Sequence, residues 1–291
     1  MIVCCTLADF NKAIASLPKD CELGFVPTMG ALHKGHISLV ENALKYTKTV
    51  IVSIFVNPTQ FNNPLDLSRY PRTIDKDCRL LSAAGAAIVF VPRVEDIYPV
   101  APSRIFDFGG LDKTGEGPKR PGHFNGVAQV VTRLFDIVKP KYAFFGEKDF
   151  QQLAIIKYFT LELGYPVEIV ACPTLREPDG LAMSSRNTLL TPDCRKAAPS
   201  INRALKNAQQ TAAHILQHNT DRKNKEITPA ALALLAIEEI EKEPLLKTEY
   251  VEIVNSLNLQ IVKNWEDAQN IQLCTAVYAG DVRLIDNIKL K

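Results

Sequence analysis

Residues 23–36 read LGFVPTMGALHKGH and place an apolar run directly before a glycine-containing loop and the start of a helix. Leu23–Val26 is almost continuously apolar, which is typical of a strand buried on both faces of a parallel sheet. In the helix predicted at Ile37–Tyr46, Ile37, Val40 and Leu44 recur at helical spacing. This order predicts a strand–loop–helix unit of an α/β fold.

The same alternation continues through the first two thirds of the chain. Further strands are predicted at Val50–Val56, Ala87–Val91, Tyr142–Phe145 and Val167–Ala171, and helices at Asp75–Ala84, Val127–Val138 and Phe150–Leu163. The pattern predicts a Rossmann-like, doubly wound parallel α/β sheet. Because such sheets bind ligands outside the carboxyl ends of their strands, polar motifs at those ends are candidates for a site.

The pattern changes after about residue 176. A polar, turn-rich stretch at Arg176–Asn187 is followed by segments with a different order of elements. Helices are predicted at Ala197–Gln217 and Pro229–Glu241, an exposed loop at His218–Ile227, and strands at Tyr250–Val254, Leu273–Val277 and Arg283–Ile285. We therefore expect a nucleotide-binding domain over residues 1–177 and a smaller C-terminal α+β domain over residues 178–291.

The composition excludes several classes of protein. The 34 Lys and Arg against 32 Asp and Glu leave a net charge of +2, and 46% of residues are hydrophobic, as in ordinary globular proteins. A disordered chain, a collagen and a basic nucleic-acid tail are excluded. No apolar run approaches the roughly 20 residues that span a bilayer, and no export signal is recognised at the start. Seven cysteines without a CxxC pair indicate inert thiols in a reduced, cytoplasmic compartment.

His33 and His36 lie where the loop enters the first helix. A helix N-terminus offers main-chain N–H groups and the positive end of a dipole to an anion such as phosphate. Residues three apart share one side of the turn, so both imidazoles would face the same anion. A metal pair or two structural histidines are the alternatives. A metal would need further ligands, and no suitable cluster lies nearby in the sequence.

Other polar stretches permit two interpretations each. Lys148 and Asp149 follow a predicted strand. The lysine could balance the charge of a phosphate, and the aspartate could accept hydrogen bonds from a ribose or support a metal ion. The alternative is that both belong to a charged turn. Ala182–Asn187 carries two serines and an arginine that could wrap a polyphosphate, or it is a plain turn. Amides in Ser53–Phe61 and the polar residues of Arg120–Phe124 suit a small ligand or the surface.

Together these stretches resemble the pantoate–β-alanine ligase family over nearly the whole chain. The matching motifs are, in order, Pro27–His36, Ser53–Phe61, Tyr70–Thr73, Arg120–Phe124, Phe145–Leu153, Ser184–Asn187 and Gly280–Asn287. The HxGH residues and the Met183–Arg186 loop also look like the two signatures of the class I nucleotidylyl-transferase superfamily. The resemblance implies that ATP and (R)-pantoate form pantoyl adenylate and pyrophosphate, and that β-alanine then displaces AMP to give pantothenate.

The resemblance also implies roles for individual residues. His36, the proton donor, with His33 and Lys148 would be catalytic. ATP would be held by Met29, Gly30, Ala31, Leu32, His33, Lys34, Gly35, His36, Gly146, Glu147, Lys148, Asp149, Leu175, Met183, Ser184, Ser185 and Arg186. Pantoate and β-alanine would be held by Gln60, Gln152, Asn57, Tyr70, Arg120 and His123. Mg²⁺ would be carried chiefly on the triphosphate, with no protein ligand assigned, and the enzyme would be a homodimer without nucleic-acid or membrane partners.

Two departures and two alternatives accompany the resemblance. Lys34 stands where the family usually has an acidic or small polar residue, and Gln209–Ile227 is longer than usual. A nucleotidylyl transferase for another acid would share the histidine and serine motifs but would have no reason to keep Gln60 and Gln152. A non-catalytic nucleotide sensor would be expected to lose the histidines or the lysine. The C-terminal domain is expected to act as a lid with a hinge near Arg176–Gly180, because a mixed anhydride must be kept from water.

Overall fold

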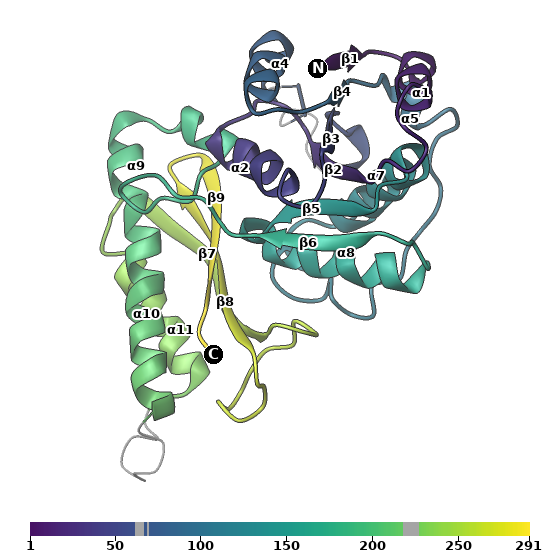
Figure 1. Ribbon diagram of the computed structural model, residues 1–291. Helices are drawn as coiled ribbons and strands as arrows, with labels where there is room; N and C mark the ends of the chain where they lie inside the picture. Colours follow the sequence, from purple (N-terminus) through teal and green to yellow (C-terminus); the bar gives the residue numbers. More distant parts are fainter. Residues whose placement is uncertain (62–66, 69, 218–226) are drawn as a thin grey trace. The chain divides into compact units, whose positions relative to one another are not determined.

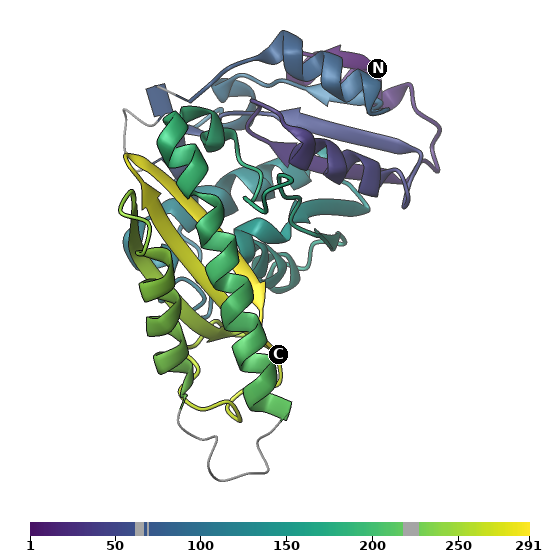
Figure 2. The ribbon, with the colours of Figure 1, turned by 90° about the vertical axis from the view of Figure 1, so that its left-hand side faces the viewer.

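The computed structural model of the chain describes residues 1–61, 67–68, 70–217 and 227–291. It divides into two compact units (Figures 1 and 2). Unit 1 is Met1–Gly109, Arg120–Glu147 and Gln152–Pro173, and unit 2 is Gly110–Lys119, Lys148–Gln151 and Thr174–Lys291. The domain boundary expected at residue 177 stays a prediction. The last segment of unit 1 ends at Pro173, and two short segments that precede it in the chain, Gly110–Lys119 and Lys148–Gln151, belong to unit 2.

Unit 1 is built on a six-stranded, wholly parallel sheet. Its strands are β1 (Ile2–Cys4), β2 (Leu23–Thr28), β3 (Thr49–Ile54), β4 (Ile88–Phe90), β5 (Tyr142–Gly146) and β6 (Glu168–Cys172), in the spatial order β1-β4-β3-β2-β5-β6. The predicted Rossmann-like sheet is confirmed. Strand β1 was not predicted, because it has only three residues and Ile2 and Val3 are half exposed.

Helices cover both faces of this sheet. They are α1 (Leu7–Ala15), α2 (Lys34–Ala43), α4 (Ile74–Ala83), α5 (Val94–Ile97), α7 (His123–Val138) and α8 (Phe150–Glu162), the last of which begins in unit 2. Phe25 contacts Phe135 of α7, whereas the next residue, Val26, packs in a cluster with Val40 of α2. Successive strand residues face opposite sides of a sheet, so α2 and α7 lie on opposite faces.

The helix after the HxGH loop begins three residues earlier than predicted, at Lys34 instead of Ile37. His33 is its N-cap, and the side chain of His36 returns to the main chain of His33 in a capping box. Histidine is not among the usual N-cap residues, which explains why the sequence pattern missed this start. The consequence is that His36 lies in the first turn of α2.

Unit 2 is centred on a three-stranded antiparallel sheet of β7 (Leu246–Asn255), β8 (Ile271–Ala279) and β9 (Val282–Lys289), in that order. In both views α10 (Pro199–Gln217) and α11 (Pro229–Ile240) run beside these strands, and they share an apolar core with them (Figures 1 and 2). The smaller α+β domain is thus confirmed as a fold. The helix predicted at Ala197–Gln217 begins two residues later, as α10 at Pro199, and α9 (Pro192–Ala197) before it was not predicted.

Two expectations concern the segment between α10 and α11. The predicted loop at His218–Ile227 lies outside the described residues except for Ile227. Of the long segment Gln209–Ile227, residues 209–217 form the end of α10. Within the part of the chain that is described, no helix combines the length and apolarity needed to cross a membrane.

Candidate active site

The order of strands in unit 1 indicates where a sheet of this kind would bind a ligand. The chain builds β2, β3 and β4 toward one edge and then returns to place β5 beside β2. In doubly wound sheets, ligands bind at such a switch point, outside the carboxyl ends of the strands. The HxGH loop follows β2 directly, Gly146 ends β5, and Asn57 and Gln60 follow β3. These predicted site residues therefore emerge at one edge of one sheet.

The rings of His33 and His36 lie against each other, with centroids 4.1 Å apart and planes tilted by 44°. The Nδ1 atom of His33 accepts a hydrogen bond from the Gly35 N–H at 3.1 Å, and Nδ1 of His36 accepts from the His33 N–H at 3.3 Å. Because Nδ1 accepts in both rings, a neutral imidazole carries its proton on Nε2. Both rings are thus held as Nε2–H donors at the start of α2, as an anion site requires.

Asp77 is a functional candidate that the sequence analysis missed. Its carboxylate is fully buried and accepts the Ala31 N–H at 3.0 Å, the Leu32 N–H at 2.9 Å and the Thr73 hydroxyl at 3.1 Å. Gly30 and Ala31 both have a positive φ, and a Cβ on Gly30 would lie 3.2 Å from the Asp77 carboxylate. A side chain at position 30 would therefore be strained by the backbone and crowded by the Asp77 carboxylate. One signal was available: Asp77 is an acidic residue one helical turn before Leu81 on the apolar face of α4.

We expect Asp77→Ala to lower the free energy of unfolding by about 1.5–3 kcal/mol, the range for hydrogen bonds to a charged group. It should also slow any reaction that depends on His33 and His36, because the loop before α2 loses its anchor. Thermal unfolding and initial rates check both effects. Asp75→Ala, at an exposed position of the same helix, is the matched control. Wild-type stability and rate in Asp77→Ala would contradict this role.

Asn57 is 1% exposed and uses its whole amide group. Its Nδ2 donates to the Gln60 Oε1 at 3.1 Å and to the Gly126 carbonyl at 3.0 Å. Its Oδ1 accepts from the Tyr98 hydroxyl at 3.0 Å and from the N–H and hydroxyl of Thr59. Burial raises the pKa of Tyr98, so this phenol keeps the proton that it donates. Asn57 therefore holds the side chain of Gln60 in place, and its predicted contact with a ligand stays a prediction.

The other predicted residues of this region gather around Gln60. Its Nε2 lies 3.2 Å from the Met29 sulfur, a weak acceptor, and its carbonyl lies 2.9 Å from Nδ1 of His123. The Tyr70 ring packs edge-on against Phe61, the residue after Gln60. The structure thus brings Met29, Gln60, Tyr70 and His123 together. Arg120 and Gln152 are half-buried in the same unit, and their part in the site stays a prediction.

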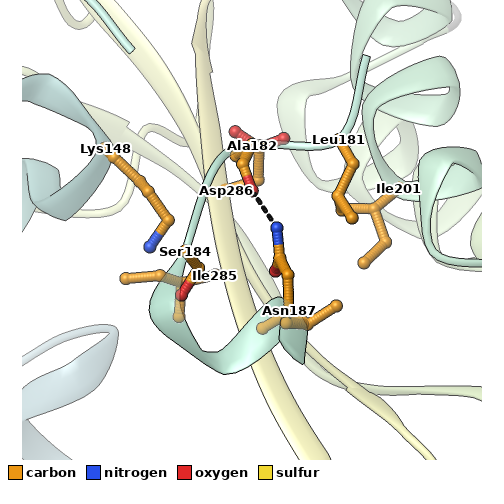
Figure 3. A pocket seen from close by; sticks show the side chains of 9 residues that line it. Lys148, Leu181, Ala182, Ser184, Asn187, Ile201, Ile285 and Asp286 are labelled. Carbon is orange, nitrogen blue, oxygen red and sulfur yellow. Dashed lines mark hydrogen bonds between the residues drawn. The ribbon is translucent and has the colours of Figure 1, made fainter. Parts of the chain in front are cut away.

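Lys148 and Ser184 line a small pocket in unit 2. Figure 3 shows the Lys148 side chain reaching toward Ser184. The Ser184 hydroxyl caps a short 3-10 helix, Ser185–Leu189, by accepting the Arg186 N–H at 3.3 Å. Asn187 donates to the Ala182 carbonyl at 3.0 Å, which closes the loop behind it. Lys148 therefore belongs to the same compact unit as the serine loop, although sequence reasoning placed it with the histidines.

A small hairpin presents the serine loop. Arg176 pairs with Ala182, and the Met183 N–H donates to the carbonyl of Leu175 at 3.0 Å. Leu175 and Met183 are the two residues predicted to frame adenine. The hairpin contains Arg176–Gly180, where the hinge was predicted, and this stretch lies wholly within unit 2. The hinge itself stays a prediction.

Two further findings concern possible metal ligands and the cysteines of the described residues. Among them, no group of three or more His, Cys, Asp or Glu side chains is placed to hold a metal ion. All seven cysteines are free. Burial raises the pKa of Cys172 to about 11, so its thiol is protonated at neutral pH and is a poor nucleophile.

Comparisons with known proteins agree with the resemblance in the sequence. The model of the family "Pantoate-beta-alanine ligase" matches residues 2–289. A pantothenate synthetase from Bacteroides thetaiotaomicron is 47% identical over 287 residues, which cover 98% of both chains.

Solved structures give the same result. The crystal structure of pantothenate synthetase from Thermus thermophilus has a TM-score of 0.89 at 40% identity and covers 100% of this chain and 99% of its own. A pantoate–β-alanine ligase from Francisella tularensis, solved with β,γ-ATP and β-alanine, has a TM-score of 0.79 at 35% identity, covering 100% and 98%. The chain therefore belongs to the pantoate–β-alanine ligase family and is an enzyme of that class.

Proposed function

We propose that this enzyme condenses (R)-pantoate with β-alanine in two steps that share one adenylate intermediate. A carboxylate oxygen of pantoate attacks the α-phosphorus of ATP, and the bond from that phosphorus to the bridging oxygen breaks, releasing pyrophosphate. The amine of β-alanine then attacks the acyl carbon of pantoyl adenylate. The acyl C–O bond breaks, AMP leaves, and the nitrogen loses a proton as the amide of pantothenate forms.

In the first step, the protein must stabilise charge that builds on the phosphates. His33 and His36, held as Nε2–H donors at the start of α2, suit this task, and the helix dipole adds to it. His36 would give its proton or hydrogen bond to an oxygen of the triphosphate. Fixed donors need no reorganisation during the reaction, which is the main source of their effect.

Unit 2 supplies further groups of the kind that hold phosphate. Lys148 carries a positive charge at the pocket that it shares with Ser184. Arg186, two residues further on, adds a guanidinium, whose planar fork fits phosphate oxygens. We infer that these residues also bind the triphosphate, with Gly146, Glu147 and Asp149 near the ribose and phosphates and with Leu175 and Met183 framing adenine.

The acid substrate would bind to the residues gathered at Gln60. An amide both donates and accepts, so Gln60 can bind the hydroxyl and the carboxylate of pantoate. We infer that Gln152 is its partner and that Tyr70, Arg120 and His123 complete the pocket. Water exclusion matters here, because a mixed anhydride exposed to water hydrolyses before the amine arrives. That need is the reason for expecting unit 2 to act as a lid.

The histidine pair carries this proposal furthest, because its tautomers are fixed by main-chain N–H groups at the switch point of the sheet. The test is pyrophosphate release from ATP, measured without acid, with pantoate, and with pantoate and β-alanine. Release that requires pantoate, followed by AMP and pantothenate in equal amounts once β-alanine is added, supports the proposal. Equal release with unrelated acids would favour another nucleotidylyl transferase, and binding of ATP without release would favour a sensor.

We expect Gln60→Ala and Gln152→Ala to weaken the binding of pantoate far more than the binding of ATP. A lost hydrogen bond to a charged group costs about 1.5–3 kcal/mol, or roughly one to two decades of affinity. Michaelis constants for both substrates check this, with Gln269→Ala at an exposed position as the control. A variant that raises the Michaelis constants of both substrates equally would contradict the assignment of Gln60 and Gln152 to pantoate.

We also propose a partner ion and a state of assembly. Among the described residues, no group of three or more His, Cys, Asp or Glu side chains is placed to hold a metal ion. Mg²⁺ is therefore expected on the phosphate oxygens themselves, where it would neutralise charge, and no step is assigned to it. A homodimer in the cytoplasm is expected from the family resemblance. Sedimentation and cell fractionation test these two points.

A further inference from the structure

The stretch Gly280–Asn287 resembles a family motif, yet the proposed function gives it no task. The structure places most of it in β9, an outer strand of the three-stranded sheet. Successive residues of a strand face opposite sides of the sheet. Arg283 and Asn287 therefore share one face, and Leu284 and Asp286 share the other, the face of the apolar core.

On the first face, Arg283 fixes the segment Gly110–Lys119. Its guanidinium makes two bonds to the Glu116 carboxylate, at 2.7 and 2.8 Å, and contacts Glu249 at 2.6 Å. Burial favours a neutral Arg283, but both carboxylates outweigh it and raise the pKa of this side chain. Gln151 connects this segment to the one after Lys148, because its Nε2 donates to the carbonyls of Leu111 and Thr114, both at 2.8 Å.

On the same face, Asn287 holds the main chain of Lys148. Its Nδ2 donates to the Lys148 carbonyl at 2.9 Å, and its Oδ1 accepts from the Gln272 Nε2 at 2.7 Å. Asn287 and Gln272 are each 7% exposed. Because Oδ1 of Asn287 accepts the bond from Gln272, the Asn287 Nδ2 donor faces the Lys148 carbonyl. The lysine backbone is fixed while its side chain reaches into the pocket.

On the opposite face, Asp286 holds the hairpin before the serine loop. Its carboxylate, 4% exposed, binds the Arg176 guanidinium at 2.7 and 2.9 Å. Arg176 also donates to the Gly180 carbonyl at 3.1 Å, within the turn of the hairpin. Two neighbouring residues of β9 thus hold the two segments of unit 2 that are proposed to bind phosphate.

We propose that Asn287 is a positioning residue for Lys148, and that β9 sets the spacing between Lys148 and the Ser184–Arg186 loop before ATP binds. This inference rests on the proposed role of Lys148 at the triphosphate. Its physical basis is the steep dependence of rate on geometry: a displacement of about 1 Å can cost a hundredfold in rate. A Lys148 on a loosely held turn would keep its charge but would contribute less to the reaction rate, because the charge would be displaced from the triphosphate.

The experiment compares Asn287→Asp and Asn287→Ala in the full-length enzyme. The aspartate keeps the acceptor for Gln272 and the size of the side chain but loses the donor to Lys148. We expect the rate constant for pantoate-dependent pyrophosphate release to fall about 10–100-fold in both variants. The pantoate KM should change by less than about threefold. Asn207→Asp, at an exposed position of α10, is the matched control for the added charge.

A double-mutant cycle with Lys148→Met separates positioning from general stability. If Asn287 acts through Lys148, Asn287→Asp should cost less than about threefold in the Lys148→Met background. The same 10–100-fold loss in both backgrounds, or a rate loss that follows a lowered Tm in both Asn287 variants, would overturn the proposal. A wild-type rate in Lys148→Met would instead remove the proposed role of Lys148, whatever the Asn287 variants do.

Discussion

His36→Ala should reduce the rate of pantoate-dependent pyrophosphate release by about 100–1000-fold, the loss that follows removal of one preorganised donor to a developing charge. The structure adds a second expected effect. Because Nδ1 of His36 accepts the His33 N–H, alanine also removes half of a capping box and should cost about 0.5–2 kcal/mol of stability. Rapid-quench measurement of pyrophosphate and thermal unfolding check the two effects.

Two substitutions at this position separate the cap from the catalytic donor. In His36→Asn, the amide can take the place of Nδ1 and keep the cap, but nothing replaces Nε2–H. We expect its stability to recover while its rate stays near that of alanine. His214→Ala, at an exposed position of α10, is the control for losing an imidazole. A rate in His36→Asn close to the wild-type rate would show that His36 only caps the helix.

Lys148→Met should slow the same step by about 100–1000-fold, because a cation aimed at a phosphate acts in the way of other preorganised electrostatic groups. Methionine keeps most of the length of the side chain and removes only the charge and its donors. The loss should appear both in the rate constant and in the KM for ATP, and the KM for pantoate should change little.

Lys148→Arg tests the kind of contact. Arginine keeps the charge but spreads it over a planar fork that needs more room than the ammonium group. We expect an intermediate rate. Lys196→Met, a neutralised lysine whose side chain is 80% exposed on α9 of the same unit, is the matched control. Lys148→Met with an unchanged rate would contradict a role at the triphosphate.

Much of the fold was predictable because its signals are local. The parallel strands of unit 1 are apolar runs, and four of its helices carry apolar residues at helical spacing. The elements that were missed are β1, α1, α5, α6 (Glu116–Lys119) and α9, of which all but α1 and α9 have three or four residues. The start of α2 was missed because histidine is a rare cap, and α10 begins at Pro199, two residues later than predicted.

The candidate site also has features that the sequence predicted and features that it did not. The motifs themselves could be read from the sequence, since each is a run of a few residues at the end of a strand. What Asn57 does could not, because its hydrogen bonds to Gly126 and Tyr98 join residues 69 and 41 positions apart. The sequence suggested a ligand contact there, whereas the structure shows an amide fully engaged by the protein around it.

The sequence by itself determined the α/β sheet, the family and the motifs at the strand ends, because periodicity and short motifs need no information from distant parts of the chain. Only the tertiary structure decided how the motifs are held. Asp77 anchors the HxGH loop from 45 and 46 residues away, Asp286 binds Arg176 over 110 residues, and Asn287 reaches Lys148 over 139. Such contacts form only when folding buries polar groups that must then find partners, and the partner available to each group is set by which segments pack together.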